Sequence, residues 1–297
     1  MSAIITDQLR ILNCENFTAG VASTSNSYYA WIGLPNASDF QSDWDSNPPA
    51  PKDAFSEEND YWDTMIALKK INAADISRVV RKIDWTSGTT YEMYRDDYSR
   101  SNISPQTSST TLYDANYYVM NQDYRVYICL QNGTNPENTE GRPSLDEPLF
   151  TDLEPRSAGA SGDGYIWKYL FTINPNQLIK FDSTSFIPLP NDWKTSSDVA
   201  AVRNNATTSG QLKIVTITGR GVGYGTAATY NNVPLLGDGQ GGKCSVVVNA
   251  AGKIDSVEVT SGGSEYTFAN VGLGNVGLNN PAGSLDASFN VIIPPEG

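Results

Sequence analysis

The stretch that decides the fold is Gly162-Asp-Gly-Tyr-Ile-Trp-Lys-Tyr-Leu-Phe-Thr-Ile173, a run dense in aromatic and aliphatic residues. In an extended chain, successive side chains point to opposite faces of the strand. One face then carries Tyr165, Trp167, Tyr169 and Phe171, and the other carries Ile166, Lys168, Leu170 and Thr172. Because both faces are largely apolar, the pattern predicts a central strand that is covered on both sides.

More strands are predicted upstream of this run. Residues 117–120 and 124–130 flank the turn Asn121-Gln-Asp123, which predicts a hairpin with Val126, Ile128 and Leu130 on one face. An aromatic strand is expected over residues 27–33, where Gly33 and then a proline end it. Residues 75–85 also have an extended-looking pattern.

Two short helices are predicted in the N-terminal part. The first covers residues 7–17, with Thr6 placed to cap it and an apolar stripe of Leu9, Ile11, Leu12 and Phe17. The second covers residues 56–71, with two glutamates in its first turn and two lysines in its last, which complement the helix dipole. Its expected amphipathic face consists of Trp62, Met65, Ile66 and Lys69.

The rest of the chain divides into loops and a repeat. Residues 36–54 and 131–164 are long polar loops, and loops of that length usually bind something or lie against a neighbour. A polar stretch over residues 182–210 is expected to be a boundary. After it, Val215–Tyr224 returns as Val257–Tyr266, at an offset of 42 residues, and each copy continues into a second strand, over residues 244–248 and 287–293. Two copies predict a small β module whose halves pack on each other.

Composition excludes several functions. The chain has 297 residues, no histidine, three cysteines and a net charge of −13. Histidine-based triads and histidine-ligated zinc are therefore ruled out, and a strongly anionic chain is a poor ligand for nucleic acid. The cysteines show neither metal-ligand spacing nor a disulfide framework. No signal peptide or membrane-spanning run is visible, so we expect a soluble protein that folds in a reducing cytoplasm.

Three local patterns resemble binding or catalytic sites but are better explained by loops and turns. Gly237–Lys243 resembles phosphate-binding loops, but strand residues follow it where such a loop needs a helix, so a turn between strands is favoured. Asp43–Asn47 alternates oxygen ligands without the glycine and closing glutamate of a calcium-binding loop. Paired carboxylates such as Asp96/Asp97, Asp43/Asp45 and Glu57/Glu58 fit a glycosidase only if the fold sets two of them across a sugar. We therefore predict no catalytic residue, no metal and no cofactor.

The 6 tryptophans and 16 tyrosines have two readings. One is a carbohydrate-stacking surface, and the other is core together with a protein–protein interface, where both residue types are enriched. For Trp167 and Tyr169, which alternate on a strand, core is preferred. Tyr91, Tyr94 and Tyr98 lie on a polar segment and are candidate interface residues.

Residues 162–173 resemble the G-D-G-Y-x-W-x-Y-L-F strand of one phage protein family, the gene-product-eight baseplate wedge subunit of T-even-like contractile-tailed phages. The matching positions are Gly162, Asp163, Gly164, Tyr165, Trp167, Tyr169, Leu170 and Phe171. Three further segments resemble the family and stand in its order: Trp62–Met65, Val79–Trp85 and Tyr124–Leu130. These anchors span roughly residues 28–195, and the sequence departs from the family pattern after about residue 195.

The resemblance implies a structural virion protein without enzymatic activity, assembled in the host cytoplasm and located in the tail baseplate. It also implies a homodimer that contacts other wedge subunits, and a layered β-sandwich with helix-bearing loops. No nucleic acid, membrane or small-molecule partner is expected.

The expected fold is mostly β, with a β-sandwich core and two short helices in or near loops over residues 1–195. A glycine-rich β-repeat module follows over residues 196–297. Two alternatives stay open: a carbohydrate- or receptor-binding phage tail module that uses exposed tryptophan and tyrosine, and a histidine-free glycoside hydrolase.

Overall fold

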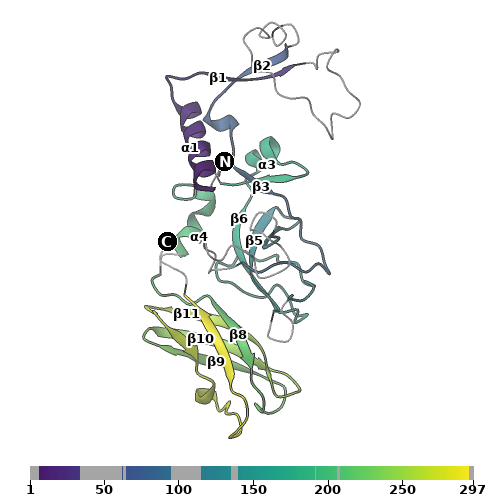
Figure 1. The fold of residues 1–297 in the computed structure, drawn as a ribbon, viewed down its shortest axis with the longest axis vertical. Helices are drawn as coiled ribbons and strands as arrows, with labels where there is room; N and C mark the ends of the chain where they lie inside the picture. The colour runs from purple at the N-terminus through teal and green to yellow at the C-terminus, as the bar shows by residue number, and fades with distance from the viewer. Residues whose placement is uncertain are drawn as a thin grey trace, which may run out of the picture. The chain divides into compact units, whose positions relative to one another are not determined.

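The computed structural model describes residues 7–33, 62, 65–94, 115–134, 140–190, 192–205 and 208–293 (Figure 1). The fold is mostly β, with 38% strand and 17% helix, as predicted. It contains several small antiparallel sheets, a curled half-barrel sheet and three short helices in the described part of the chain. The chain separates into two compact units, Met1–Ser77 and Arg78–Gly297.

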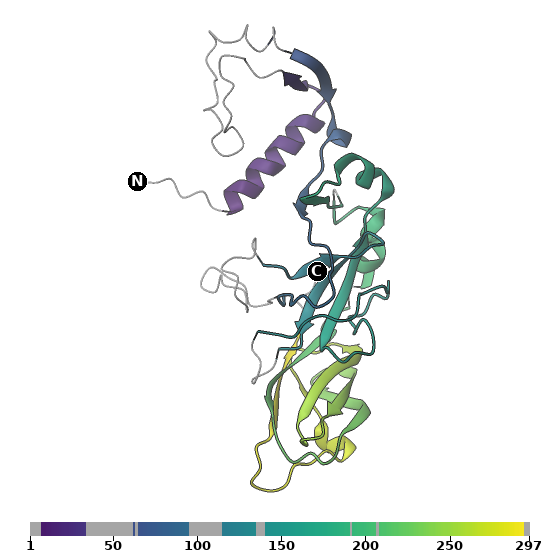
Figure 2. The same cartoon turned by 90° about the vertical axis from the view of Figure 1, so that its right-hand side faces the viewer.

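The described part of the first unit contains the helix α1 (Asp7–Ala22), one hairpin and the helical residue Trp62, which lies within the predicted helix over residues 56–71 (Figure 2). Helix α1 covers the predicted first helix and extends it. Strand β1 (Tyr28–Gly33) also forms where it was predicted. It pairs antiparallel with β2 (Met65–Ile71), and the short 3-10 turn η2 (Ala73–Asp75) follows.

The predicted helix over residues 56–71 is wrong over Met65–Ile71, which is the strand β2. Its charge pattern suited a helix, but a strand at Tyr28–Gly33 needs backbone hydrogen-bond partners, and tertiary pairing overrides local propensity. Lys69 does not complete a helical face, because it lies in β2. Its ammonium lies 2.6 Å from the carboxylate of Asp75. Residues 56–61, 63 and 64, and the predicted loop over residues 36–54, lie outside the described residues.

The second unit contains a three-stranded sheet in the order β4-β5-β6 (Tyr118–Met120, Arg125–Asn132, Tyr165–Thr172). The predicted hairpin is confirmed as β4 and β5. Strand β6 is confirmed, but its predicted central position is wrong, because β5 takes the centre and only an isolated bridge from Arg156 meets the outer edge of β6. In that bridge the backbone N–H groups of Arg156 and Trp167 each donate to the other residue's carbonyl at 3.0 Å.

Two apolar clusters hold this sheet. The first contains the buried Tyr91, Val119, Tyr127, Cys129, Phe150, Tyr165 and Trp167. The second contains Met120, Val126, Phe171, Ile173, Ile187 and Val199. Of the predicted loop over residues 131–164, residues 131 and 132 belong to β5, and residues 133, 134 and 140–164 form no helix or strand.

The polar stretch over residues 182–210 is more than a boundary. It contains β7 (Phe186–Pro188), which pairs with β3 (Val79–Arg81), and then the short turn η3 (Ser197–Val199) and helix α4 (Ala200–Asn205). Helix α3 (Pro175–Phe181) precedes it, started by a proline in its first turn and by the Asn174 side chain, which accepts from the Asn176 N–H. Ile187 and Val199 of this stretch are buried in the second cluster, whereas Phe186 and Trp193 are exposed.

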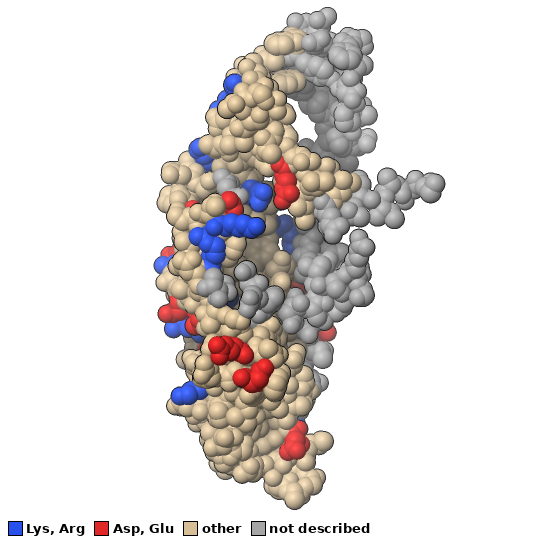
Figure 3. All heavy atoms as spheres, turned by 90° about the vertical axis from the view of Figure 1, so that its left-hand side faces the viewer, with Lys and Arg blue, Asp and Glu red and all other residues tan. Residues whose placement is uncertain are grey.

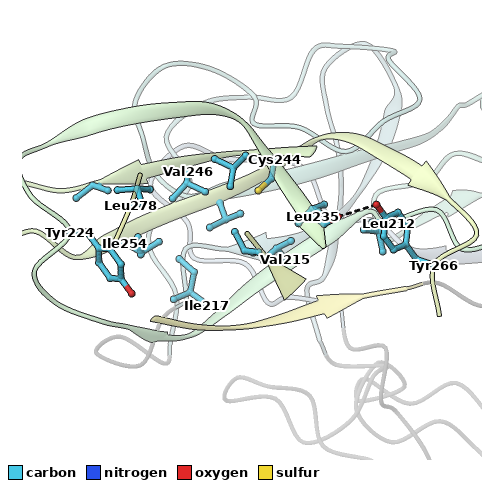
Figure 4. Packing of buried hydrophobic residues seen from close by; sticks show 14 residues of the cluster. Leu212, Val215, Ile217, Tyr224, Leu235, Cys244, Val246, Ile254, Tyr266 and Leu278 are labelled. Carbon is cyan, nitrogen blue, oxygen red and sulfur yellow. Dashed lines mark hydrogen bonds between the residues drawn. The ribbon is translucent and has the colours of Figure 1, made fainter. Parts of the chain in front are cut away.

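The C-terminal strands surround one core. Four of them form a sheet in the order β11-β10-β9-β12 (Ile254–Ser264, Gln240–Val248, Ala228–Gly237, Ala269–Val271), and β8 (Ile214–Arg220) pairs with β13 (Ala287–Ile292). Figure 4 shows their apolar side chains packed between the strands. The fully buried members are Leu212, Val233, Cys244, Val246 and Ile254. Gly237–Lys243 is a turn and the start of a strand, as predicted.

The 42-residue repeat is visible in the backbone. The N–H of Tyr224 donates to the carbonyl of Gly252 at 3.0 Å, and the N–H of Tyr266 donates to the carbonyl of Gly210 at 3.2 Å. Both glycines have positive φ, 59° at Gly210 and 69° at Gly252, a conformation that favours glycine. Equivalent positions of the two copies thus make equivalent contacts with each other.

The two copies also exchange strands. The first strand of copy one, β8, pairs with β13 of copy two, and the first strand of copy two, β11, pairs with β10 of copy one. Both ladders skip one residue at the same repeat position, Thr218 in β8 and Thr260 in β11. The predicted packing of the two halves therefore includes backbone pairing between them.

Candidate assembly surface

The most unusual surface of the described chain lies in the first unit. Val21 is the only buried residue among the side chains described there. Eleven large apolar side chains of this unit are exposed: Leu9, Ile11, Leu12, Phe17, Tyr28, Tyr29, Trp31, Ile32, Trp62, Ile66 and Leu68. We refer to these eleven residues as the N-terminal apolar surface.

The hairpin exposes apolar groups on both of its faces. Paired residues of antiparallel strands share a face, so Trp31 and Leu68, which are register partners, lie on one side together with Tyr29. Ile32, which is 67% exposed, pairs with Ala67 on the other side. Ile66 lies beside the irregularity between Ile32 and Gly33 and is 63% exposed. Neither face of the hairpin is buried in the described structure.

Such a unit gains little stability from its own contacts. A two-stranded hairpin is at best marginally stable in water without a packed face. Large exposed apolar areas mark interaction sites, because soluble proteins rarely leave them open. On the face drawn in Figure 3, charged side chains of both signs are scattered over a largely uncharged surface. The exposed apolar side chains of the first unit are suited to association through apolar contact.

Of the three predicted interface tyrosines, one is corrected. Tyr91 is 2% exposed and belongs to the core, so its ring is not available to a partner. Its hydroxyl accepts from the Thr86 N–H at 2.7 Å, and its own N–H donates to the Tyr165 hydroxyl at 2.8 Å. Burial raises the pKa of Tyr91 despite these hydrogen bonds. Segment polarity suggested exposure, but long-range contacts with β6 place the ring inside.

The other two tyrosines have different outcomes. Tyr94 is 41% exposed, and its ring packs against that of Tyr117 with centroids 5.7 Å apart. It is still accessible to a partner. Tyr98 lies outside the described residues.

The Gly162–Phe171 motif builds a structural joint. The Asp163 carboxylate accepts from the backbone N–H of Leu145 at 2.8 Å and from that of Tyr165 at 3.0 Å, which ties the long loop to the start of β6. Gly162 and Gly164 both have positive φ, and a Cβ on Gly164 would lie 2.7 Å from the Cα of Gly133. Both glycines are therefore required by the turn itself.

The aromatic residues of the motif complete this joint. The rings of Tyr165 and Trp167 stack with centroids 5.3 Å apart, and both side chains are fully buried. The Tyr165 hydroxyl donates to the Arg142 carbonyl at 2.7 Å, and burial raises its pKa. Phe171 is buried, while Tyr169 and Leu170 are half-buried. The motif fills the core and connects strands.

The described residues hold no group of three or more histidine, cysteine, aspartate or glutamate side chains that could bind a metal. Burial raises the pKa of Cys129 and that of Cys244, the latter to about 12, which keeps both thiols protonated and unreactive. The carboxylate pairs of the glycosidase alternative, and Asp43–Asn47, lie outside the described residues. No helix of the described structure is long and apolar enough to cross a membrane.

Sequence reasoning missed the hairpin half of the N-terminal apolar surface, because it assigned β2 to a helix. The missed signal is the aromatic strand over Tyr28–Gly33, which had no pairing partner in the prediction. Comparison with known proteins adds no family: a scan against models of protein families finds no match to this chain, and a search of curated proteins finds no significant one. The likeness of residues 162–173 to baseplate wedge subunits is therefore still a prediction.

Proposed function

We propose that this protein is a structural subunit of the baseplate wedge of a contractile phage tail, where it forms a homodimer and contacts other wedge subunits. The observation that carries the proposal is the N-terminal apolar surface, eleven exposed large side chains in a unit with one buried residue among those described. A protein whose function is association needs such a surface, whereas an enzyme or a small-molecule carrier does not.

The size of the surface fits a permanent contact. These side chains are between 36% and 67% exposed. Taking about 200 Å² for each large side chain, the surface offers on the order of 1,000 Å² of apolar area per copy. A standard interface buries about 800 Å² per partner, and because these side chains lie on both hairpin faces and on α1, their area would be shared between a second copy and another wedge subunit.

The motif strand gives the proposal its family. Residues 162–173 match the wedge-subunit pattern, and in this chain they join a loop, a sheet and a buried aromatic cluster. We extend the proposal to the architecture: a layered β-sandwich core over residues 1–195, and a separate β-repeat module over residues 196–297. The tail baseplate, assembled in the host cytoplasm, is the proposed location.

Charge explains how free subunits would avoid premature association. A net charge of −13 on each chain would make free dimers repel one another and keep them soluble. Partners with complementary charge would then be selected during assembly.

The proposal is tested by the composition of purified particles. Phage particles from cells that produce this chain should contain it at a fixed ratio to the other tail proteins, measured by quantitative mass spectrometry. The ratio should persist through a salt wash and density-gradient purification. Loss of the chain from particles that keep their other tail proteins would contradict the proposal.

A further inference from the structure

The C-terminal strands form a second feature that the proposed assembly role does not use, an open cavity of about 420 Å³. Its wall combines the end of β9, the chain from Asn270 to Asn280 and the start of β13. The volume falls in the range of about 300–1,000 Å³ that is usual for small-ligand sites. All of its lining comes from the β-repeat, whose core is well packed.

A buried hydroxyl at this cavity has a hydrogen without an acceptor. Tyr224 lines the cavity and is only 5% exposed. Its hydroxyl accepts from the Ala287 N–H at 2.7 Å, and no acceptor for its own hydrogen lies among the described residues.

The repeat supplies the matched comparison. Tyr266, its counterpart 42 residues on, accepts from the Gly242 N–H at 3.0 Å and also donates to the Leu235 carbonyl at 3.0 Å. Figure 4 draws the second bond as a dashed line between Tyr266 and Leu235. Buried hydroxyl groups normally have their partners, so the hydrogen of the Tyr224 hydroxyl is left for a water molecule or a ligand oxygen to accept.

The polar side chains around the cavity belong mainly to one type. The amides of Asn275 and Asn279 are exposed at its wall and have no hydrogen-bond partner in the described chain. Asn270 and Asn280 add two further amides, each with one hydrogen bond inside the chain, and Asp286 is the only charged residue of the lining. An asparagine amide both donates and accepts, as a sugar hydroxyl does.

The apolar part of the wall complements the polar part. Leu236 is 48% exposed at the cavity, and Phe289 lines it from β13 as a half-buried ring. Aliphatic and aromatic surfaces of this kind pack against the C–H face of a sugar ring. With no lysine or arginine in the lining, the cavity has no counter-charge for an anionic ligand, and one carboxylate is too few for a bound divalent cation.

We propose that this cavity is a binding site for a neutral saccharide, with the Tyr224 hydroxyl as a donor and the Asn275 and Asn279 amides bridging vicinal hydroxyl groups. The site is independent of the proposed function, because a tail subunit and a free carbohydrate-binding protein would use it alike. It also differs from the tryptophan and tyrosine surface that the sequence suggested for sugar binding.

The test uses the full-length protein on an array of bacterial surface oligosaccharides, followed by calorimetric titration of the strongest neutral hit. The double variant Asn275→Ala/Asn279→Ala should lower the affinity at least tenfold, and Tyr224→Phe should lower it about threefold to tenfold. Asp286→Asn should change it less than threefold, since the ligand is uncharged.

Two controls separate binding from folding. Asn290→Ala removes an exposed amide of β13 outside the cavity and should leave affinity unchanged. Tyr266→Phe should lower the melting temperature, because it removes the hydrogen bonds of this hydroxyl to Gly242 and Leu235. It should leave affinity unchanged, because Tyr266 does not line the cavity. The proposal is overturned if the folded wild-type protein binds no oligosaccharide on the array. It is also overturned if the asparagine double variant binds as tightly as the wild type, or if the only hits are anionic glycans or peptides.

Discussion

Replacing Trp167 with alanine should lower the free energy of unfolding by about 3–5 kcal/mol. The indole is fully buried, stacks on Tyr165 at 5.3 Å and meets the ring of Tyr91 edge-on at 5.8 Å between centroids. Alanine would leave a cavity that two neighbouring rings cannot fill without breaking the hydrogen bond from Tyr91 to Tyr165. Urea unfolding followed by circular dichroism measures the change.

Trp193→Ala is the matched control for this prediction. Trp193 is 45% exposed, and the hydrogen bond from Arg203 reaches its backbone carbonyl, which the substitution keeps. We expect a loss below about 1 kcal/mol there, as for a typical surface change. A loss of that small size at Trp167 would show that β6 is not the buried strand described above.

The second large effect concerns association. The wild-type protein should have a solution mass of twice 32.2 kDa at micromolar concentration. The quadruple variant Tyr29→Thr/Ile32→Thr/Ile66→Thr/Leu68→Thr should have the mass of one chain, because it removes apolar area from both hairpin faces while keeping good strand formers. Light scattering after size-exclusion chromatography measures both masses.

An equal number of apolar residues can be replaced elsewhere as a control. Leu145, Leu149, Ile179 and Leu285 are 52%, 54%, 84% and 76% exposed, and all of them lie in the second unit. Replacing these four with threonine should leave the dimer intact. If both quadruple variants keep the wild-type mass, the N-terminal apolar surface does not hold the dimer together.

Local sequence patterns correctly predicted the strands and the turn that depend on neighbouring residues in the sequence. The alternation over residues 165–172 gave both covered faces of β6 because a strand's side-chain period is strict. The polar turn residues at 121–123 also predicted the hairpin of β4 and β5 correctly, because a turn depends on the residues within it. The offset of 42 residues predicted equivalent strands, and these lie at equivalent places in the fold.

Long-range partners were beyond the reach of sequence patterns. Met65–Ile71 fits the end of a helix by its charge pattern, and only its pairing with Tyr28–Gly33 makes it a strand. Tyr91 is on a polar segment, but its core position depends on a hydroxyl 74 residues away in sequence. A repeat likewise does not reveal whether a strand pairs within its own copy or, as here, with the other.

The N-terminal apolar surface was likewise predictable in its local part and not in the part that depends on long-range pairing. Its helical half was visible as an apolar stripe on residues 7–17, whereas its hairpin half depended on the strand pairing that was missed. The exposed fractions of the side chains could come only from the three-dimensional fold.

A cryo-electron microscopy map of the intact tail tests the central claim most directly. It should show this chain in the baseplate, with Tyr29, Ile32 and Leu68 covered by a second copy or another tail subunit, and with residues 165–172 enclosed in its core. A tail that lacks the chain, or one in which this hairpin faces open solvent, would contradict a role in assembly.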